Sequence, residues 1–116
     1  MKKEEKLTPS LPKGFRDRWG KELALKKNII KIIEANFIKY GFLPLETSPM
    51  EITSNIGSFL AEDESNPMSD VFTFEDSKES LTLRYDMSAP RARFVAQNYR
   101  DLTFPFKRYA YGDVFR

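Results

Sequence analysis

The stretch that decides the fold is LTLRYDMSAPRARFVAQN, which spans Leu81–Asn98. Within it, Leu81–Arg84 is typical of a strand and Ala89–Asn98 is typical of a helix. Ser88 is a residue type that favours the N-cap of a helix, and Pro90 fits the first helical turn, where a proline breaks no hydrogen bond. The stretch therefore predicts a strand that leads through a short polar segment into a helix.

The residues before this stretch predict a long helix over Lys21–Tyr40. Its apolar residues recur at steps of three or four and form one stripe. They are Leu25, Ile29, Ile32, Ile33 and Phe37. Gly41 follows as a candidate left-handed C-cap residue. Phe42–Glu46 predicts an irregular or edge strand because it contains Pro44, and the apolar spacing in Glu51–Leu60 predicts a second helix.

Two further segments complete the predicted fold. Val71–Glu75 is strand-like, and a connection of hairpin length, Asp76–Ser80, joins it to the strand at Leu81–Arg84. Lys107–Arg116 is rich in Tyr and Phe and predicts a last strand, with a bulge at Gly112. Short connections between neighbouring strands favour antiparallel pairing. The sequence therefore predicts an α+β fold in which helices flank an antiparallel sheet.

Composition limits the classes of function. The chain has 116 residues, 41% of them apolar and 31% charged, which suits one soluble globular domain. Met1–Ser10 is charged and has no apolar core, so it predicts a mobile leader rather than a secretory signal. The absence of histidine and cysteine excludes imidazole and thiolate chemistry from these residues. The net charge of +2 is too small to favour nucleic-acid binding by charge alone, and no apolar run reaches the roughly 20 residues of a membrane span. We therefore expect a cytoplasmic protein with no membrane partner.

A polar cluster follows the strand that ends at Arg84. Alternate residues of a strand share a face, so Arg84, Asp86 and Ser88 can project to one side. There an Asp86 carboxylate would pair with a substrate ammonium, and the Ser88 hydroxyl would add an orienting hydrogen bond. In the alternative, Asp86 and Ser88 cap the next helix and Arg84 pairs with Asp86. Spacing alone favours this structural role, because caps are far commoner than binding sites.

Several arginines are candidate phosphate ligands. Arg116 lies at the end of the predicted last strand, where a guanidinium could grip a phosphate with two hydrogen bonds. The alternative is an ordinary surface arginine, which is the commoner arrangement. Arg91, Arg93 and Arg100 pose the same choice between contacts to phosphate or RNA and a solvated helix face, and spacing favours the solvated face.

The segment Tyr40–Met50, YGFLPLETSPM, predicts a stiff corner between the long helix and a short strand. An exposed strand at this corner would invite symmetric pairing with a second subunit. An ordinary helix-to-strand turn has the same composition, so both interpretations stay open.

Together these segments resemble the class II aminoacyl-tRNA synthetases, and within that class the histidyl-tRNA synthetases, over about Leu11–Arg116. KGFRD is similar to the family's N-terminal Gly-x-Arg-Asp element, and YGFLPLETSPM resembles class motif 1, with Pro49 at its characteristic proline. VFTFEDSKESLTLRYDMSAPRARFVAQN resembles the family's strand pair and its Leu-Arg-x-(Asp or Glu) block. KRYAYGDVFR resembles the opening of class motif 2. The order of these segments makes the resemblance specific.

The resemblance implies the class II catalytic fold and a function for the complete protein. That function is ATP-dependent activation of L-histidine to histidyl-adenylate and transfer to tRNA(His), with Mg²⁺ beside the ATP phosphates. Asp86, Met87 and Ser88 would bind histidine, and the Asp86 carboxylate would accept from its α-ammonium. Arg116 would be the catalytic arginine that contacts both the ATP α-phosphate and the histidine carboxylate. A homodimer is also implied. Its interface residues would be Gly41, Phe42 and Pro49.

The resemblance is incomplete in two respects. Ser88 replaces the usual threonine of the family but keeps the hydroxyl. The sequence given stops at Arg116, before the motif 2 glutamate, the histidine-recognition loop, motif 3 and the anticodon-binding domain. We therefore expect residues 11–116 to be the N-terminal portion of a catalytic domain that ends within motif 2 and is inactive as a fragment.

Two alternative functions share the same resemblance. The regulatory subunit of ATP phosphoribosyltransferase, which acts in histidine biosynthesis, has this fold but is not a catalyst. Its block more often carries glutamine where this chain has Pro90, which favours the synthetase. The other alternative is a degenerate domain that binds uncharged tRNA or only dimerises. The presence of Asp86, Ser88 and Arg116 argues against such decay.

Overall fold

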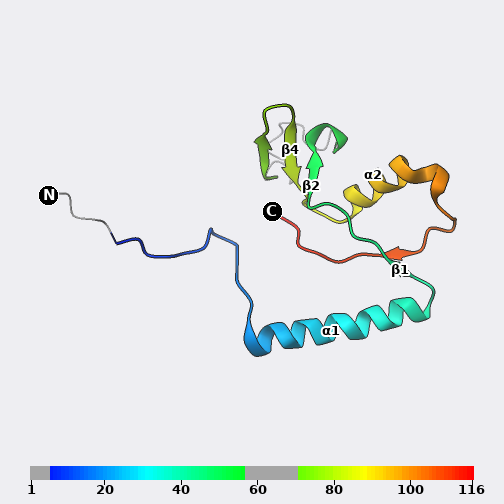
Figure 1. Cartoon of the computed structure of the whole chain (residues 1–116), viewed down its shortest axis with the longest axis horizontal. Coiled ribbons are helices and arrows are strands. Elements are labelled where there is room, and N and C mark those ends of the chain that lie inside the picture. The colour runs from blue at the N-terminus through cyan, green and yellow to red at the C-terminus, as the bar shows by residue number, and fades with distance from the viewer. Residues whose placement is uncertain (1–5, 57–70) are drawn as a thin grey trace, which may run out of the picture. The chain divides into compact units, whose positions relative to one another are not determined.

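The computed structural model describes residues 6–56 and 71–116, and Figure 1 shows the course of the chain. The chain divides into two compact units, Met1–Asn36 (unit 1) and Phe37–Arg116 (unit 2). Residues 6–10, the described part of the predicted leader, form no helix or strand.

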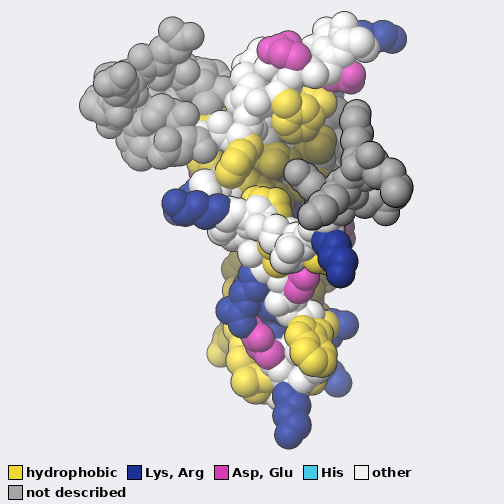
Figure 2. All heavy atoms as spheres, turned by 90° about the vertical axis from the view of Figure 1, so that its left-hand side faces the viewer, with side chains coloured by type: hydrophobic (Ala, Val, Ile, Leu, Met, Phe, Trp, Pro, Cys, Tyr) yellow, Lys and Arg dark blue, Asp and Glu magenta, His cyan; other side chains and the backbone are white. Residues whose placement is uncertain are grey.

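The helix predicted over Lys21–Tyr40 is present as α1, Gly20–Lys39. None of its residues is buried. Its apolar stripe is open to solvent, from Phe37 at 39% exposed to Leu25 at 61%. In the view of Figure 2, yellow hydrophobic side chains reach the surface between charged ones. Such a stripe normally packs against another element, and α1 shows no such burial.

The C-terminus of α1 is closed by the predicted glycine cap. Gly41 has φ +85°, a left-handed conformation that only glycine adopts without strain. Its N–H donates to the Ile38 carbonyl at 3.0 Å, and the Phe42 N–H donates to the Phe37 carbonyl at 3.0 Å. These two bonds form a Schellman motif. The Phe37 and Phe42 rings meet edge to face with centroids 5.8 Å apart, which adds the apolar contact that usually accompanies this cap.

Unit 2 contains a three-stranded sheet whose antiparallel pairing was predicted, although one of its strands was predicted as a helix. Its order is β2 (Met50–Ile52), β4 (Ser80–Leu83) and β3 (Thr73–Glu75). Thr82 lies in the central strand opposite Glu51 and Thr73. Its side chain is fully buried, and its hydroxyl bonds with that of Thr53 at 2.8 Å.

A second, two-stranded pair joins distant parts of unit 2. Strand β1, Leu43–Pro44, pairs in parallel with β5, Arg108–Tyr109. The sequence predicted antiparallel neighbours only. Antiparallel pairing follows from short loops, whereas the long connection between β1 and β5 allows a parallel register. Phe37 stacks on Tyr109 with centroids 5.1 Å apart.

The helix predicted over Glu51–Leu60 is wrong in its described part. Met50–Ile52 is strand β2, and Thr53–Asn55 is one turn of 3-10 helix. Residues 57–60 lie outside the described residues. The apolar spacing was overridden by sheet pairing: β2 bonds to β4 along its length, and the Thr53 hydroxyl also bonds with that of Ser80 at 2.9 Å. Residues 53–55 then continue the chain as a turn.

The predicted helix after β4 is α2, Ser88–Asn98. Pro90 is buried in its first turn. Ser88 is not its N-cap, which corrects that prediction: Met87 holds the N-cap position and the helix already includes Ser88. The Oδ1 atom of Asp86, one residue earlier, accepts from the Ala89 N–H at 3.1 Å and so caps the helix. Asp and Ser cap equally well in general, so residue type could not decide between them.

The strand predicted over Lys107–Arg116 is much shorter than expected. Only β5, Arg108–Tyr109, pairs in a ladder, and residues 110–116 are assigned to neither a helix nor a strand. Gly112 has no positive φ. A Cβ built on it would clash with Nη2 of Arg84. The glycine is therefore explained by the close approach of the Arg84 side chain rather than by the predicted bulge.

Candidate functional site

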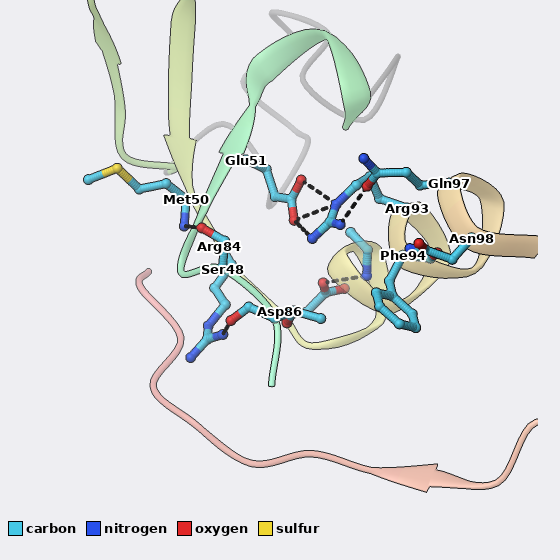
Figure 3. A network of polar contacts seen from close by, with 11 residues as sticks. Ser48, Met50, Glu51, Arg84, Asp86, Arg93, Phe94, Gln97 and Asn98 are labelled. Atoms are coloured by element: carbon cyan, nitrogen blue, oxygen red, sulfur yellow. Dashed lines mark hydrogen bonds and ion pairs between the residues drawn. The ribbon is translucent and has the colours of Figure 1, made fainter. Parts of the chain in front are cut away.

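The loop between β4 and α2 carries the residues that the sequence singled out first. The Asp86 Oδ1 atom accepts from the Ala89 N–H, so this carboxylate caps α2 as the structural alternative predicted (Figure 3). Asp86 and Met87 are half-buried, whereas Ser88 is exposed. A carboxylate at a helix N-terminus is stabilised by the positive end of the helix dipole. The loop thus holds a fixed, partly accessible negative charge.

Arg116 lies against this same loop. Its Nε donates to the carbonyl of Tyr85 at 3.0 Å, one residue before Asp86. The predicted phosphate ligand and the predicted ammonium ligand are therefore on adjoining segments, although about 30 residues separate them in the sequence. This use of Nε orients the guanidinium, whose Nη atoms form the fork that suits a phosphate or carboxylate.

Arg84 does not pair with Asp86 in the contacts that the structure gives it. It donates from Nε to the carbonyl of Asp113 at 2.7 Å and from Nη1 to the carbonyl of Thr47 at 3.3 Å. Arg84 is 9% exposed. A buried guanidinium needs such acceptors, because leaving its donors unsatisfied is costly. It joins the loop after β1 to the C-terminal segment.

An ion pair joins β2 to α2, and sequence reasoning missed it. Arg93 donates to both carboxylate oxygens of Glu51, with its shortest contact 2.9 Å from Nη2 to Oε1. Its Nη1 also donates to Gln97 at 3.1 Å. Figure 3 shows Glu51 and Arg93 pointing toward one another. The one available signal was a glutamate inside an apolar strand. The Arg93 guanidinium is thus bonded to other side chains of unit 2, and it neither lies on a solvated face nor offers a free phosphate ligand.

An open groove of about 870 Å³ lies beside this ion pair. It is lined by residues of β2, of the turn that follows it and of α2, including Glu51, Arg93 and Gln97. Asp86, Met87, Ser88 and Arg116 are not among its lining residues. The predicted site residues therefore do not line this groove, although Ala89, whose N–H donates to Asp86, does.

Tyr85 links the two segments of the predicted site. Burial raises the pKa of its hydroxyl above the ordinary value of 10.0, and the neighbouring Asp86 carboxylate raises it further. Both effects disfavour the phenolate, because a charge in a poorly hydrated position beside a like charge is costly. Tyr85 therefore stays neutral at physiological pH, and its carbonyl is the group that receives Arg116.

The described residues offer no ready metal cage and no membrane span. Across residues 6–56 and 71–116, no three His, Cys, Asp or Glu side chains come together to hold an ion. In the same part of the chain, no helix is both long and apolar enough to cross a membrane.

Comparisons with known proteins give one consistent result. No protein-family model matches the chain. A histidine–tRNA ligase of Pelagibacter ubique is 64% identical over 116 residues, which is 100% of this chain and 25% of that protein. The chain thus spans about a quarter of the length of the curated relatives it matches.

Two solved structures share the fold. Histidyl-tRNA synthetase from Nostoc sp. is 30% identical with a TM-score of 0.76, covering 92% of this chain and 25% of that one. A Bacillus halodurans protein described as an ATP phosphoribosyltransferase regulatory subunit/histidyl-tRNA synthetase is 27% identical with a TM-score of 0.79, covering 97% and 29%. The predicted resemblance and α+β class are confirmed: in sequence and in fold, the chain matches a fragment of the class II histidyl-tRNA synthetases.

Proposed function

We propose that these residues are the N-terminal part of the catalytic domain of a histidine–tRNA ligase. The complete protein would activate L-histidine with ATP, release pyrophosphate and pass the histidyl group to tRNA(His) in the cytoplasm. The observation that carries this proposal is the match to histidine–tRNA ligases along the whole chain. The contact of Arg116 with the Asp86 loop supports it, because the reaction needs an anionic and a cationic ligand side by side.

The proposed roles rest on the family resemblance, and the charges of the residues suit them. The Asp86 carboxylate accepts from the α-ammonium of histidine, and Ser88 and Met87 complete the contacts beside it. Charge-assisted bonds of this kind contribute about 1.5–3 kcal/mol each. One Asp86 oxygen also caps α2, which holds the carboxylate in place before substrate arrives.

Arg116 is the proposed catalytic residue. Its guanidinium contacts both the histidine carboxylate and the ATP α-phosphate. A carboxylate oxygen attacks the α-phosphorus, a new P–O bond forms, and the bond to the bridging oxygen breaks to release pyrophosphate. Arg116 would hold the two anions in line and neutralise the charge that accumulates as phosphorus becomes five-coordinate. Without such a cation, the two anionic reactants would repel one another.

We also propose that the complete protein is a homodimer whose interface includes Gly41, Phe42 and Pro49. The exposed apolar stripe of α1, with Ile29 and Ile33 each about half exposed, supports the presence of a partner surface. Light scattering should give twice the monomer mass. A monomer that is fully active would contradict this part of the proposal.

A second candidate is the regulatory subunit of ATP phosphoribosyltransferase, because the name of the Bacillus halodurans neighbour includes both functions. Histidine-dependent exchange of labelled pyrophosphate into ATP separates them. The ligase should catalyse the exchange only when histidine is present. A folded complete protein that shows no exchange and copurifies with a phosphoribosyltransferase would favour the regulatory subunit instead.

A further inference from the structure

Arg84 joins two separate segments of unit 2 to the end of β4. Its backbone N–H donates to the carbonyl of Pro49 at 2.9 Å, and its carbonyl accepts from the N–H of Phe115 at 2.8 Å. Its side chain adds the bonds to the carbonyls of Thr47 and Asp113. One residue therefore holds the segment around Thr47–Pro49 on one side and residues 113–115 on the other.

A guanidinium is required for the side-chain part of this arrangement. The bonds to Asp113 and Thr47 use two different nitrogens of one rigid plane. Lysine offers a single nitrogen on a flexible stem and cannot span two fixed acceptors in the same way. Both acceptors are backbone carbonyls, so the arrangement constrains the path of the main chain directly.

Gly112 provides the space in which this guanidinium lies. An added Cβ would overlap with Nη2 and would lie 3.2 Å from Cζ of Arg84. Such an overlap does not occur in real structures, so an alanine would force the guanidinium or the backbone to move. Because Gly112 does not have a positive φ, the need for glycine here is one of space and not of backbone conformation.

Both halves of the proposed site are close neighbours of these bonds. Asp86 follows Arg84 by two residues, and Arg116 follows Phe115 directly. The Tyr85 carbonyl, next to Arg84, accepts from Arg116. Building on the proposed function, we infer that Arg84, seated against Gly112, is a positioning residue that sets the spacing between the Asp86 carboxylate and the Arg116 guanidinium. A displacement of about 1 Å at such a site can cost about a hundredfold in rate.

The test uses the complete ligase with Arg84→Met, Arg84→Lys and Gly112→Ala, measured by histidine-dependent pyrophosphate exchange. The Michaelis constant KM does not depend on the fraction of enzyme that is folded, whereas the apparent kcat does. A positioning role predicts that KM for both histidine and ATP rises about tenfold or more in Arg84→Met and that Arg84→Lys does not restore it. Arg18→Met, an exposed arginine of unit 1, is the matched control and should change neither KM.

Gly112→Ala gives an independent test, because it leaves Arg84 in place. It should raise both KM values, and the same change made on top of Arg84→Met should add little, since the clashing guanidinium is gone. If Arg84→Met does not fold, Gly112→Ala alone decides by the same criterion. If the wild-type protein exchanges pyrophosphate and Gly112→Ala leaves both KM values unchanged, the inference is overturned.

The same experiment distinguishes a failure of the proposed function from a failure of the inference about Arg84. A wild-type protein that catalyses no exchange contradicts the ligase proposal. Calorimetric binding of histidine to the same variants then decides the role of Arg84. Binding about tenfold weaker in Gly112→Ala would support it, and either equal binding or no binding to the wild type would overturn it.

Discussion

Two ion pairs within residues 6–56 and 71–116 show how differently the two units are built. In unit 1, Arg16 pairs with Glu22, and their side chains are 60% and 49% exposed. In unit 2, Arg93 pairs with Glu51, and these side chains are only 25% and 5% exposed. The exposed pair joins residues near in sequence, whereas the buried pair joins β2 to α2 across 42 positions. Unit 1 is organised by local pattern, and unit 2 is held together by polar contacts between distant segments.

The largest effect that this comparison predicts is on stability. Glu51→Ala removes the carboxylate that pairs with the largely buried Arg93 guanidinium. We therefore expect the free energy of unfolding of unit 2 to fall by about 3 kcal/mol. Native-state hydrogen exchange of the β2 and β4 amides in the complete protein would measure the loss. Glu22→Ala is the control and should cost at most about 1 kcal/mol. Equal losses in both variants would refute the contrast between the two units.

A smaller effect is expected where α1 ends. Gly41→Ala places a side chain at φ +85°, which costs about 1 kcal/mol. The new Cβ would also lie 3.3 Å from Nζ of Lys107, which donates to the Tyr40 carbonyl. Gly41→Asn should lose less, because asparagine tolerates the left-handed region. Hydrogen exchange of the amides in the last turn of α1 measures both losses. A loss as large for asparagine as for alanine would point to crowding instead of backbone strain.

The smallest predicted effect concerns pH. The folded-state pKa of Tyr85 is raised above 10.0, so the folded protein favours the neutral phenol more than the unfolded chain does. The stability from this difference is fully present below about pH 10 and is lost as pH rises through the folded-state pKa. The thermal midpoint should therefore fall less steeply above about pH 10 in Tyr85→Phe than in the wild type. Parallel curves would show that this hydroxyl is not shielded.

The parts of the fold that depend on residues close together in the sequence were predictable. Helix α1 has a periodic stripe and a capping glycine at Gly41, and the β3–β4 hairpin has strand-like residues around a short connection. Strand β2 was not predictable in the same way. Its apolar spacing also fits a helix, and the pairing with β4 that decides between them involves residues about 30 positions away.

The residues of the proposed site stand out in the sequence, but the contacts that they make do not. Asp86 and Arg116 stand out as charged residues at the ends of predicted elements, and resemblance gave them roles. Their approach through the Tyr85 carbonyl is a contact to the backbone, which no side-chain pattern reveals. The same is true of Arg84, whose partners are main-chain carbonyls, and of Gly112, whose lack of a side chain matters only because Arg84 lies against it.

The central claim is that the loop after β4 holds histidine by charge, and Asp86→Asn tests it most directly. Asparagine can still cap α2 but removes the negative charge that would meet the α-ammonium. Calorimetry on the complete protein should show histidine binding weakened by about tenfold or more, with ATP binding changed less than about twofold. An equal loss for both ligands, or no loss for either, would contradict the account.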